Sequence, residues 1–581
     1  MSKTQLRECT LKLAEIEEIN KRNCKKAVEL VRHISESLVW SEQNNSDFFS
    51  YFVKFDVLSD FKRLLISDFE KSLKAQLIQS ANILLHNLKN QSSLDYLLKS
   101  EFYELIVSYP YDFEKEELSN DFCSLLKGIV TNLSREKLLE YLKRNHYSLL
   151  DRALAFFDHK DKMLRTVCRS VIITLFQISD QHLQNFLVNC GVFLEVVACV
   201  RNQVFKFNNK FLKYKQLPVL ESKLFDLTES IYYLNDILEI KECSEYVSNL
   251  FLKELVLPVL VGSLGSEKCL NCHIRIHIAA FLLAQIFQVV KHTPFLDALA
   301  MSVYLHITTP ELLQASLSPL NSEANVLKNS AQLIEFLEYP EQSALEVVDN
   351  PVSGVMSSYL RSRDESLITL NLHIIQSIAL NESISEIVLL RCKLKTPFQK
   401  EIYNQELVEI IIQLLNKEPC LRYSTMKLLL KLLVFFVKKN LLEEHRVFLV
   451  ECYLHRIKNL TKYLEKDYLE DKFLEFFSQE LKLSAQIKLD QKLRCEYHFV
   501  LPLIEEEHSS IALEKRPPLG DSESLHLEIK VFFLMRKCLL LLVPSSVPES
   551  LDLDEQPLES AYLLQKLQEE ATLLANFRTH L

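Results

Sequence analysis

The stretch YLLKSEFYELI at residues 96–106 has three counterparts, which are YFVKFDVLSDF at 51–61, YLKRNHYSLLD at 141–151 and FLVNCGVFLEV at 186–196. Each begins with an aromatic residue, and the starts at Tyr51, Tyr96, Tyr141 and Phe186 are 45 residues apart. A helical repeat of about 40–47 residues is typical of armadillo and HEAT proteins. The spacing therefore predicts an all-α fold, an armadillo/HEAT-like α-solenoid.

The segments that follow these stretches keep the same phase. Apolar residues align in sets of three, which are Leu77, Phe122 and Val167; Ile78, Cys123 and Cys168; Ala81, Leu126 and Val171; Leu85, Val130 and Leu175; and Leu88, Leu133 and Ile178. A single repeat of this size cannot bury its apolar face alone, so it stacks on its neighbours. We predict two layers of packed helices from about residue 48 to 200, with the four aromatic residues in equivalent positions and Leu175 in the core.

Composition supports a helical protein without nucleic-acid-binding character. The 581 residues include six glycines, whereas average usage would give about forty. β-hairpins and phosphate-binding loops rely on glycine for positive φ or close backbone approach. The formal net charge of −10 removes the overall positive charge that nucleic-acid binders usually carry.

The cellular compartment can be inferred from cysteine usage and apolar runs. Fourteen cysteines are scattered mostly singly, and the charged N-terminus lacks the apolar core of a signal peptide. Both features favour reduced thiols in the cytosol. The best apolar runs, IAAFLLAQIFQVV at 278–290 and LLLKLLVFFV at 428–437, fall short of the ~18 residues that span a bilayer. Any membrane association is therefore predicted to be peripheral.

The helix DKMLRTVCRSVIITLFQIS at 161–179 places Arg165 and Arg169 opposite an apolar face. Asp161 precedes Arg165 by four residues, as Glu418 precedes Arg422 in KEPCLRYSTMKLLLKLL at 417–433. An acid there suits the helix N-terminus, and the arginine can pair with it or with an acid of the adjacent repeat. The alternatives are a structural role and a partner-binding role for the two arginines, and we favour the structural one.

One cluster has the residue types of a metal site. CLNCHIRIH at 269–277 contains Cys269, Cys272, His273 and His277, which could hold Zn²⁺, and C-x-x-C-H is also the haem-attachment pattern. The competing interpretation is a loop that leads into a buried helix. No second pair lies nearby, and one C-x-x-C cannot build the two zinc sites of a RING domain. We therefore predict no metal and no cofactor.

Catalysis is not indicated by any motif. The chain lacks G-x-x-x-x-G-K-[ST], G-x-G-x-x-G, G-x-S-x-G and H-E-x-x-H, so we predict a non-enzyme with no catalytic residues.

The segment KFNNKFLKYK at 206–215 interleaves Lys206, Lys210, Lys213 and Lys215 with aromatic residues. It could contact an anionic membrane or nucleic acid. A solvated loop between repeats is the favoured interpretation.

The domain organisation follows from these patterns. We expect an N-terminal helix within 1–35, repeats of about 45 residues over 36–317 with an inserted loop near 201–215, and a linker at 318–366 that is rich in Ser, Asn, Pro and acids. A second helical block is expected at 367–542, and a flexible acidic segment with a terminal helix at 543–581.

Several stretches resemble the FPL-domain family of Ema (endosomal maturation defective) and C-type-lectin-16A-like proteins. They are ESLVWSEQNNSDFFSYFVKFDVLSDFKRLL at 36–65, MLRTVCRSVIITLFQIS at 163–179, YYLNDILEI at 232–240, LVLPVLVGSL at 255–264, AAFLLAQIFQVVKHTPFLDALA at 279–300 and EKRPPLGDSESLHLEIKVFFLMRKCLLLL at 514–542. The resemblance assigns 36–317 to the FPL domain. Larger relatives continue past the last stretch into a β-rich, PH-like region, whereas about 39 residues remain here, so functions of that region are in doubt for this chain.

The resemblance implies a non-enzymatic scaffold or adaptor in endosome–lysosome trafficking and autophagy, including endosome or phagosome maturation and mitophagy. It implies a cytoplasmic protein, peripheral on endosomal, lysosomal and Golgi membranes. Expected partners are a Rab small GTPase, vesicle tethering machinery or a ubiquitin ligase, with no nucleic acid. The alternative is a non-catalytic subunit or regulator of a ubiquitin-ligase complex.

Overall fold

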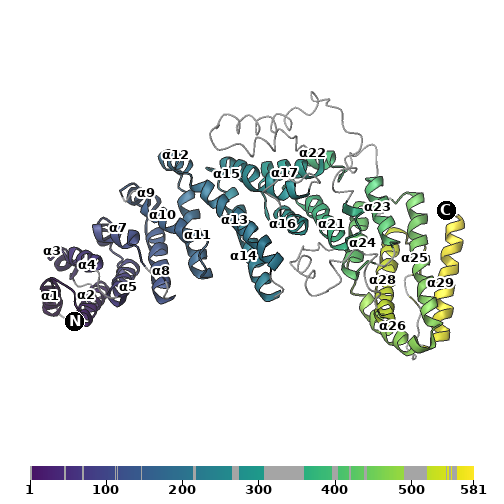
Figure 1. The fold of residues 1–581 in the computed structure, drawn as a ribbon, viewed down its shortest axis with the longest axis horizontal. Coiled ribbons are helices and arrows are strands. Elements are labelled where there is room, and N and C mark those ends of the chain that lie inside the picture. Colours follow the sequence, from purple (N-terminus) through teal and green to yellow (C-terminus); the bar gives the residue numbers. More distant parts are fainter. Residues whose placement is uncertain are drawn as a thin grey trace, which may run out of the picture. The chain divides into compact units, whose positions relative to one another are not determined.

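The computed structural model describes residues 3–580, apart from 45–46, 68–70, 112, 114–115, 145–146, 214–216, 265–273, 306–358, 396–402, 418–420, 438–440, 490–519, 545, 549–550 and 552–558. The helices follow one another along the chain as labelled in Figure 1. The chain divides into two compact units. Unit 1 contains Met1–Cys199 and Asp236–Val247, and unit 2 contains Val200–Asn235 and Ser248–Leu581.

Each repeat of unit 1 consists of a short first helix, a second helix and a third helix. The first helices are α3 (Phe49–Lys54), α6 (Gln91–Leu98), α9 (Arg135–Arg144) and α12 (Gln181–Asn189). The second helices are α4 (Val57–Ile66), α7 (Glu101–Ser108), α10 (Ser148–Ala155) and α13 (Val192–Lys213), which continues into unit 2. The third helices are α5 (Lys71–Asn87), α8 (Glu116–Asn132) and α11 (Lys162–Phe176). Three helices per repeat are the armadillo arrangement.

The helices of unit 1 stack in two layers. The third helices pack in succession, α5 on α8 and α8 on α11, and α2 (Cys24–Gln43) packs on the free side of α5. The second helices α4, α7 and α10 form the other layer. The described residues of the chain contain no β-strand. The predicted all-α, armadillo/HEAT-like α-solenoid is confirmed.

Residues 45 apart occupy equivalent positions. Tyr51, Tyr96, Tyr141 and Phe186 all lie on first helices. The next residue in each repeat is at most 1% exposed, as the exposures of Phe52, Leu97, Leu142 and Leu187 show. The aligned sets of the third helices are also buried, except for Val167 and Leu133, which are half-buried. Leu175 is 1% exposed, which confirms it as a core residue.

Particular residues cap the N-termini of the helices, and two glycines allow a turn and a close helix contact. Asn90, Asp161 and Asp180 cap α6, α11 and α12 by accepting backbone N–H donors of the first turn. Gly191 has φ +75° and lets the chain turn between α12 and α13, which suits glycine. On α8, a Cβ at Gly128 would lie 2.8 Å from Leu85 Cδ2, so glycine allows α8 to approach α5 closely.

Unit 2 is also built of packed helices. Its elements are α14 (Leu217–Leu238, as far as Asn235), η1 (Leu252–Val261), η2 (Gly262–Leu264), α16 (Ile276–Val289), α17 (Thr293–Leu305), α21 (Glu365–Leu380), α22 (Glu386–Arg391), α23 (Gln405–Leu415), α24 (Tyr423–Val437), α25 (Glu443–Leu464), η4 (Asp467–Leu469), α26 (Glu470–Ser484), α28 (Asp521–Leu542) and α29 (Ser560–His580). A central row runs from α16 through α21 and α24 to α28. α25 and α26 also pack on α28, and α29 packs on α25.

The predicted inserted loop near 201–215 is wrong for its described part, because residues 201–213 are the C-terminal half of α13. Val200, Val204 and Phe207 are at most 4% exposed, and their spacing of four and three continues one buried helix face. The interleaved lysines concealed this periodicity. Residues 214–216 lie outside the described residues.

Other predicted boundaries differ in detail. The N-terminal segment holds two helices, α1 (Lys3–Ala14) and α2, and α2 crosses the boundary expected at residue 35. Most of the expected linker lies outside the described residues, and its described end contains the start of α21. The segment predicted to be flexible begins with a packed stretch, since Val543 and Val547 are at most 5% exposed.

One helix in the described residues, Ser244–Leu264, is long and apolar enough to cross a membrane, and 67% of its most apolar window is buried inside the protein. The bent pair Gln181–Asn189 and Val192–Phe211, broken by 47°, passes the same test when taken together. Core helices of water-soluble folds have the same length and composition, so these segments are weak evidence for membrane insertion.

Candidate partner-binding surfaces

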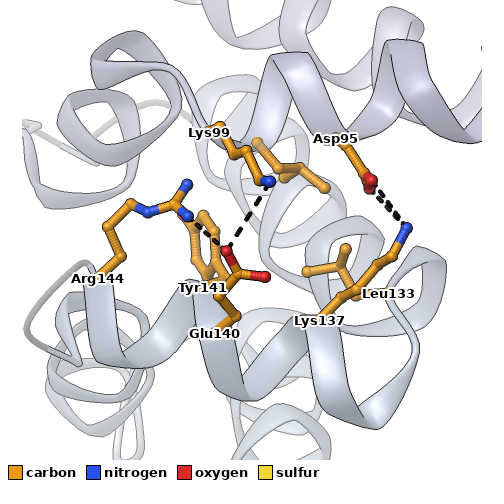
Figure 2. A pocket seen from close by; sticks show the side chains of 8 residues that line it. Asp95, Lys99, Leu133, Lys137, Glu140, Tyr141 and Arg144 are labelled. Atoms are coloured by element: carbon orange, nitrogen blue, oxygen red, sulfur yellow. Dashed lines mark hydrogen bonds and ion pairs between the residues drawn. The ribbon is translucent and has the colours of Figure 1, made fainter.

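A charged groove separates the first helices α6 and α9 of successive repeats (Figure 2). Lys137 Nζ donates to both carboxylate oxygens of Asp95 at 2.8 and 2.9 Å. Glu140 Oε1 lies 2.7 Å from Arg144 Nη2 and 3.9 Å from Lys99 Nζ. Each charged side chain that lines the groove thus has an opposite charge within it.

This groove joins two successive repeats. Its cavity of about 30 Å³ has room for a water molecule. The hydrogen bonds from Lys137 and Gln91 lower the pKa of the Asp95 carboxyl. Pairs of the same kind recur on other repeats, between Lys143 and Asp180 at 3.4 Å and between Lys62 and Glu101. Such exposed pairs each add little to stability.

A larger cavity of about 480 Å³ lies in unit 1, at the end of α11 and the last turn of α14. It is lined by Arg135, Ile173, Gln177, Ser179, Asp236, Glu239, Ile240, Lys241 and Glu242. Ligand pockets usually measure about 300–1,000 Å³. The lining has three carboxylates and two cations, which makes this cavity a candidate contact surface with a small excess of negative charge.

Two carboxyls of this cavity have opposite pKa shifts. The Ser179 hydroxyl donates to Glu242, and together with the backbone N–H of Glu242 and the charges of Arg135 and Lys241 it lowers the pKa of that carboxyl. Burial, followed by the charge of Glu239, raises the pKa of Asp236. Arg135 and Asp236 are 101 residues apart in the sequence, so no local pattern could reveal this cavity.

The arginines at 165 and 169 are core residues of unit 1. Both are 6% exposed. Arg165 Nη1 donates to the His159 carbonyl at 3.1 Å, and the Arg169 guanidinium lies 4.7 Å from the centre of the Phe157 ring. The structural interpretation is therefore supported over partner binding.

The matching arginine of the second block pairs across repeats. Arg422 Nε lies 3.4 Å from Glu365 Oε1 on α21, which is the pairing expected with an acid of an adjacent repeat. Glu418 lies outside the described residues. Sequence reasoning missed Glu365, because it lies 57 residues before Arg422.

The structure describes one of the four candidate zinc ligands. His277 Nε2 lies 2.9 Å from Asp364 Oδ2, whereas Cys269, Cys272 and His273 lie outside the described residues. Burial acts to raise the pKa of Asp364, but the hydrogen bond and charge of His277 and two backbone N–H groups outweigh it and lower that pKa. In the structure His277 therefore pairs with Asp364, the residue that caps the N-terminus of α21.

The lysine-rich end of α13 forms a basic surface together with Arg275. The sequence analysis did not identify Arg275 as part of it. Lys206 is exposed and Lys210 is half-buried. The Arg275 guanidinium lies 5.4 Å from the centre of the Phe211 ring, and the Arg275 backbone N–H donates to Asn208 Oδ1 at 3.0 Å. We call Lys206, Lys210 and Arg275 the α13 basic surface.

The fold and these surfaces define an α-solenoid with charged contact surfaces on its repeats. A family model described as FPL, an uncharacterised conserved protein family, matches residues 31–176. The resemblance to FPL-domain proteins is thereby confirmed, and the chain is similar to the CLEC16A proteins.

Three relatives illustrate the similarity. Protein TRANSPARENT TESTA 9 of Arabidopsis thaliana is 25% identical over 50% of this chain and 37% of its own length. Protein CLEC16A of Mus musculus is 27% identical over 48% of this chain and 29% of its own length. The Protein CLEC16A homolog of Drosophila melanogaster is 22% identical over 88% of this chain and 58% of its own length.

The chain spans between 29% and 58% of the length of these curated relatives. Among solved structures, Kap95p bound to RanGDP matches with a TM-score of 0.30 and 11% identity, over 98% of this chain and 57% of that chain. This likeness is too weak to bear on function.

Proposed function

We propose that this chain is a non-enzymatic helical scaffold in endosome–lysosome membrane trafficking and autophagy, including endosome or phagosome maturation and mitophagy. The observation that carries the proposal is the FPL match at residues 31–176, which falls on the stacked repeats of unit 1. Similarity to CLEC16A proteins of mouse and Drosophila supports the trafficking role.

The architecture supports a scaffold because stacked repeats present long surfaces to other proteins. Arg165 and Arg169 are buried, and the charged side chains of the α6–α9 groove pair with one another. Among the described residues, we propose the cavity near Asp236 and the α13 basic surface as contact surfaces for partners.

The partners that we propose are proteins of vesicle traffic, namely a Rab small GTPase, tethering machinery or a ubiquitin ligase. Through them the chain would act in the cytoplasm, peripherally on endosomal, lysosomal and Golgi membranes. Nucleic acid is not proposed as a partner, because the net charge is −10 and the α13 basic surface is small.

Proximity labelling in cells tests this function. The labelled neighbours of the wild-type chain are compared with those of a Lys206→Glu, Lys210→Glu, Arg275→Glu variant. The matched control is Lys482→Glu with Lys488→Glu, because both lysines are exposed near the end of α26 in the same unit. Thermal melts of all three proteins verify that the variants fold.

We expect the wild-type chain and the control to label small GTPases and tethering proteins of endosomes and lysosomes. The α13 basic surface variant should label them less. Endolysosomal proteins missing from the wild-type sample would refute the trafficking role. A sample dominated by ubiquitin-ligase subunits would favour the alternative of a non-catalytic ligase subunit.

A further inference from the structure

The cavity of unit 1 that contains Asp236 differs from the α6–α9 groove in the pairing of its charges. In that groove, each charged side chain lies 3.9 Å or less from an opposite charge. In the cavity, which measures about 480 Å³, Arg135, Asp236 and Lys241 form no ion pair with any residue that the structure describes. Contacts between repeats therefore do not close this cavity, and its charges can act on a ligand.

The two cations of the cavity already act on a carboxylate of the chain itself. The hydrogen bond from Ser179, followed by the backbone N–H of Glu242 and the charges of Arg135 and Lys241, lowers the pKa of the Glu242 carboxyl. An anionic ligand beside these cations would lie close to the Glu242 carboxylate and be repelled by it. The positive part of the cavity is thus not the part that lacks an opposite charge.

The carboxylate of Asp236 has no such cation. Burial, followed by the charge of Glu239, raises the pKa of the Asp236 carboxyl, and no cation of the described residues opposes this shift. The two acids are three residues apart at the end of α14, so their side chains lie on the same face. Neighbouring carboxylates favour a cation between them. The charge that this cavity lacks is therefore positive, and its place is at Asp236.

The rest of the lining suits a long side chain. Ile240 is 5% exposed and Ile173 of α11 is half-buried, and both line the cavity together with the exposed amide of Gln177. The methylene groups of an arginine pack on apolar surface while its charged head stays at a polar one. The planar guanidinium carries five N–H donors in a fixed fork, which suits several neighbouring acceptors better than the single nitrogen of lysine.

We propose that this cavity receives an arginine side chain of a partner protein, with its guanidinium on Asp236 and its methylene groups against Ile173 and Ile240. The inference deepens the proposed scaffold function, on which it rests for the origin of the arginine. The binding itself depends on the cavity alone and does not require the trafficking role.

The test uses the full chain with labelled isoleucine methyl groups, and N-acetyl-arginine amide as the probe. Methyl NMR spectra follow the titration, with resonances assigned from Ile173→Val and Ile240→Val variants. The signals of Ile173 and Ile240 should shift and saturate, because the probe fills the cavity that they line. The signal of Ile78, which is fully buried on α5, should not move. Absence of a saturable shift at the two lining isoleucines would overturn the proposal.

A second probe isolates the charge. N-acetyl-citrulline amide has nearly the shape of the arginine probe but is neutral, and it should bind at least about five-fold more weakly because the ion pair with Asp236 is lost. Added salt should weaken binding of the arginine probe and leave that of the citrulline probe nearly unchanged. Equal affinities of the two probes would refute the assignment of a cation to this cavity.

Two variants locate the cation. Asp236→Asn should weaken binding of the arginine probe at least about five-fold and reduce the difference between the two probes. The matched control is Glu136→Gln, which removes an exposed acid of α9 that does not line the cavity, and it should bind like the wild-type chain. Thermal melts verify that both variants fold. Equal losses in the two variants would show attraction by overall charge and refute a site at Asp236.

The two proposals fail separately. The titrations use the purified chain and variants of the cavity, whereas proximity labelling uses cells and a variant of the α13 basic surface. A chain that labels endolysosomal proteins but does not bind the arginine probe would refute the arginine site and leave the trafficking role standing. Binding of the probe by a chain that labels no endolysosomal protein would do the opposite.

Discussion

At the scale of single residues, positions 45 apart share one environment. Ile78, Cys123 and Cys168 lie on α5, α8 and α11 and are at most 1% exposed. A hydrogen bond with Cys123, together with burial, raises the pKa of the Cys168 thiol. A thiol in such surroundings stays protonated and unreactive, so Cys168 serves the packing of successive third helices.

Leu175 tests this packing. A Leu175→Ala substitution should lower the free energy of unfolding by roughly 2–5 kcal/mol, because it leaves a cavity in the core. The control is Ser170→Ala on the exposed face of the same helix, which should change it by less than about 0.5 kcal/mol. Denaturant melts measure both. A Leu175→Ala value as small as the control would mean that the buried face of α11 is wrongly assigned.

A second prediction concerns zinc binding by Cys269 and Cys272. We expect the purified chain to contain no zinc, because a single C-x-x-C pair is weak evidence for a zinc site and His277 pairs with Asp364. Elemental analysis measures this. One zinc per chain, lost in a Cys269→Ser, Cys272→Ser variant, would contradict the prediction.

At the scale of helices, a polar side chain of one helix can accept hydrogen bonds from the first residues of another helix. Glu365 of α21 is fully buried, and its Oε1 accepts from the Arg422 backbone N–H at 2.6 Å and the Thr425 hydroxyl at 2.7 Å. Arg422 immediately precedes α24, which starts at Tyr423. Glu365 therefore supplies from a neighbouring helix the capping acceptor that Asp161 supplies locally for α11.

Removal of the Glu365 side chain should destabilise unit 2. Glu365→Ala breaks a buried charge contact and should cost roughly 3–5 kcal/mol, whereas Glu365→Gln keeps an acceptor oxygen and should cost less. The matched control is Glu386→Ala, whose ion pair with Lys395 is exposed and should contribute less than about 1 kcal/mol. Denaturant melts report these values, and equal losses for Glu365→Ala and Glu386→Ala would refute the cap.

The stability of α29 should depend on pH through Glu570. Burial raises the pKa of this carboxyl above its ordinary value of 4.5, although Arg536 and Tyr453 oppose the shift. A raised pKa means that the folded state binds the proton more tightly than the unfolded state, so this group stabilises the fold less as the pH rises above 4.5.

A Glu570→Gln variant isolates this effect. Its free energy of unfolding, minus that of the wild-type chain, should increase as the pH is raised from about 4.5 to 7. Denaturant melts across this range measure the difference. A difference that does not change with pH would show that Glu570 has an ordinary pKa.

At the scale of the whole molecule, two units of stacked helices carry a net charge of −10. Buried apolar faces hold each unit together. The α13 basic surface consists of Lys206 and Lys210 of α13 and of Arg275, which precedes α16. In the long apolar helix Ser244–Leu264, 67% of the most apolar window is buried inside the protein. Membrane recruitment is therefore expected to depend on partners.

Liposome flotation of the purified chain tests this expectation. Each basic residue near an anionic surface adds about 1 kcal/mol, which salt screens. The chain should not float with neutral vesicles and should float weakly with anionic ones. Tight flotation that resists salt would reveal a direct lipid site.

Much of the fold follows from the sequence, whereas the candidate surfaces follow from it only in part. The repeat of 45 residues predicted the equivalent positions of Tyr51, Tyr96, Tyr141 and Phe186, because apolar periodicity is a local property. The inserted loop predicted near 201–215 was wrong for residues 201–213, because the interleaved lysines hid the helical spacing of the buried residues Val204 and Phe207. The cavity of Arg135 and Asp236 was missed because its walls come from distant segments.

The sequence alone determined the helical class, the repeat length and the core residues, since each depends on side-chain hydrophobicity at fixed spacing. Only the tertiary structure decided which charges are available to a partner. The pairing of Arg422 with Glu365, of His277 with Asp364 and of Arg536 with Glu570 joins residues 34–87 positions apart. Coulomb and hydrogen-bond energies depend on distances that exist only after the helices have stacked.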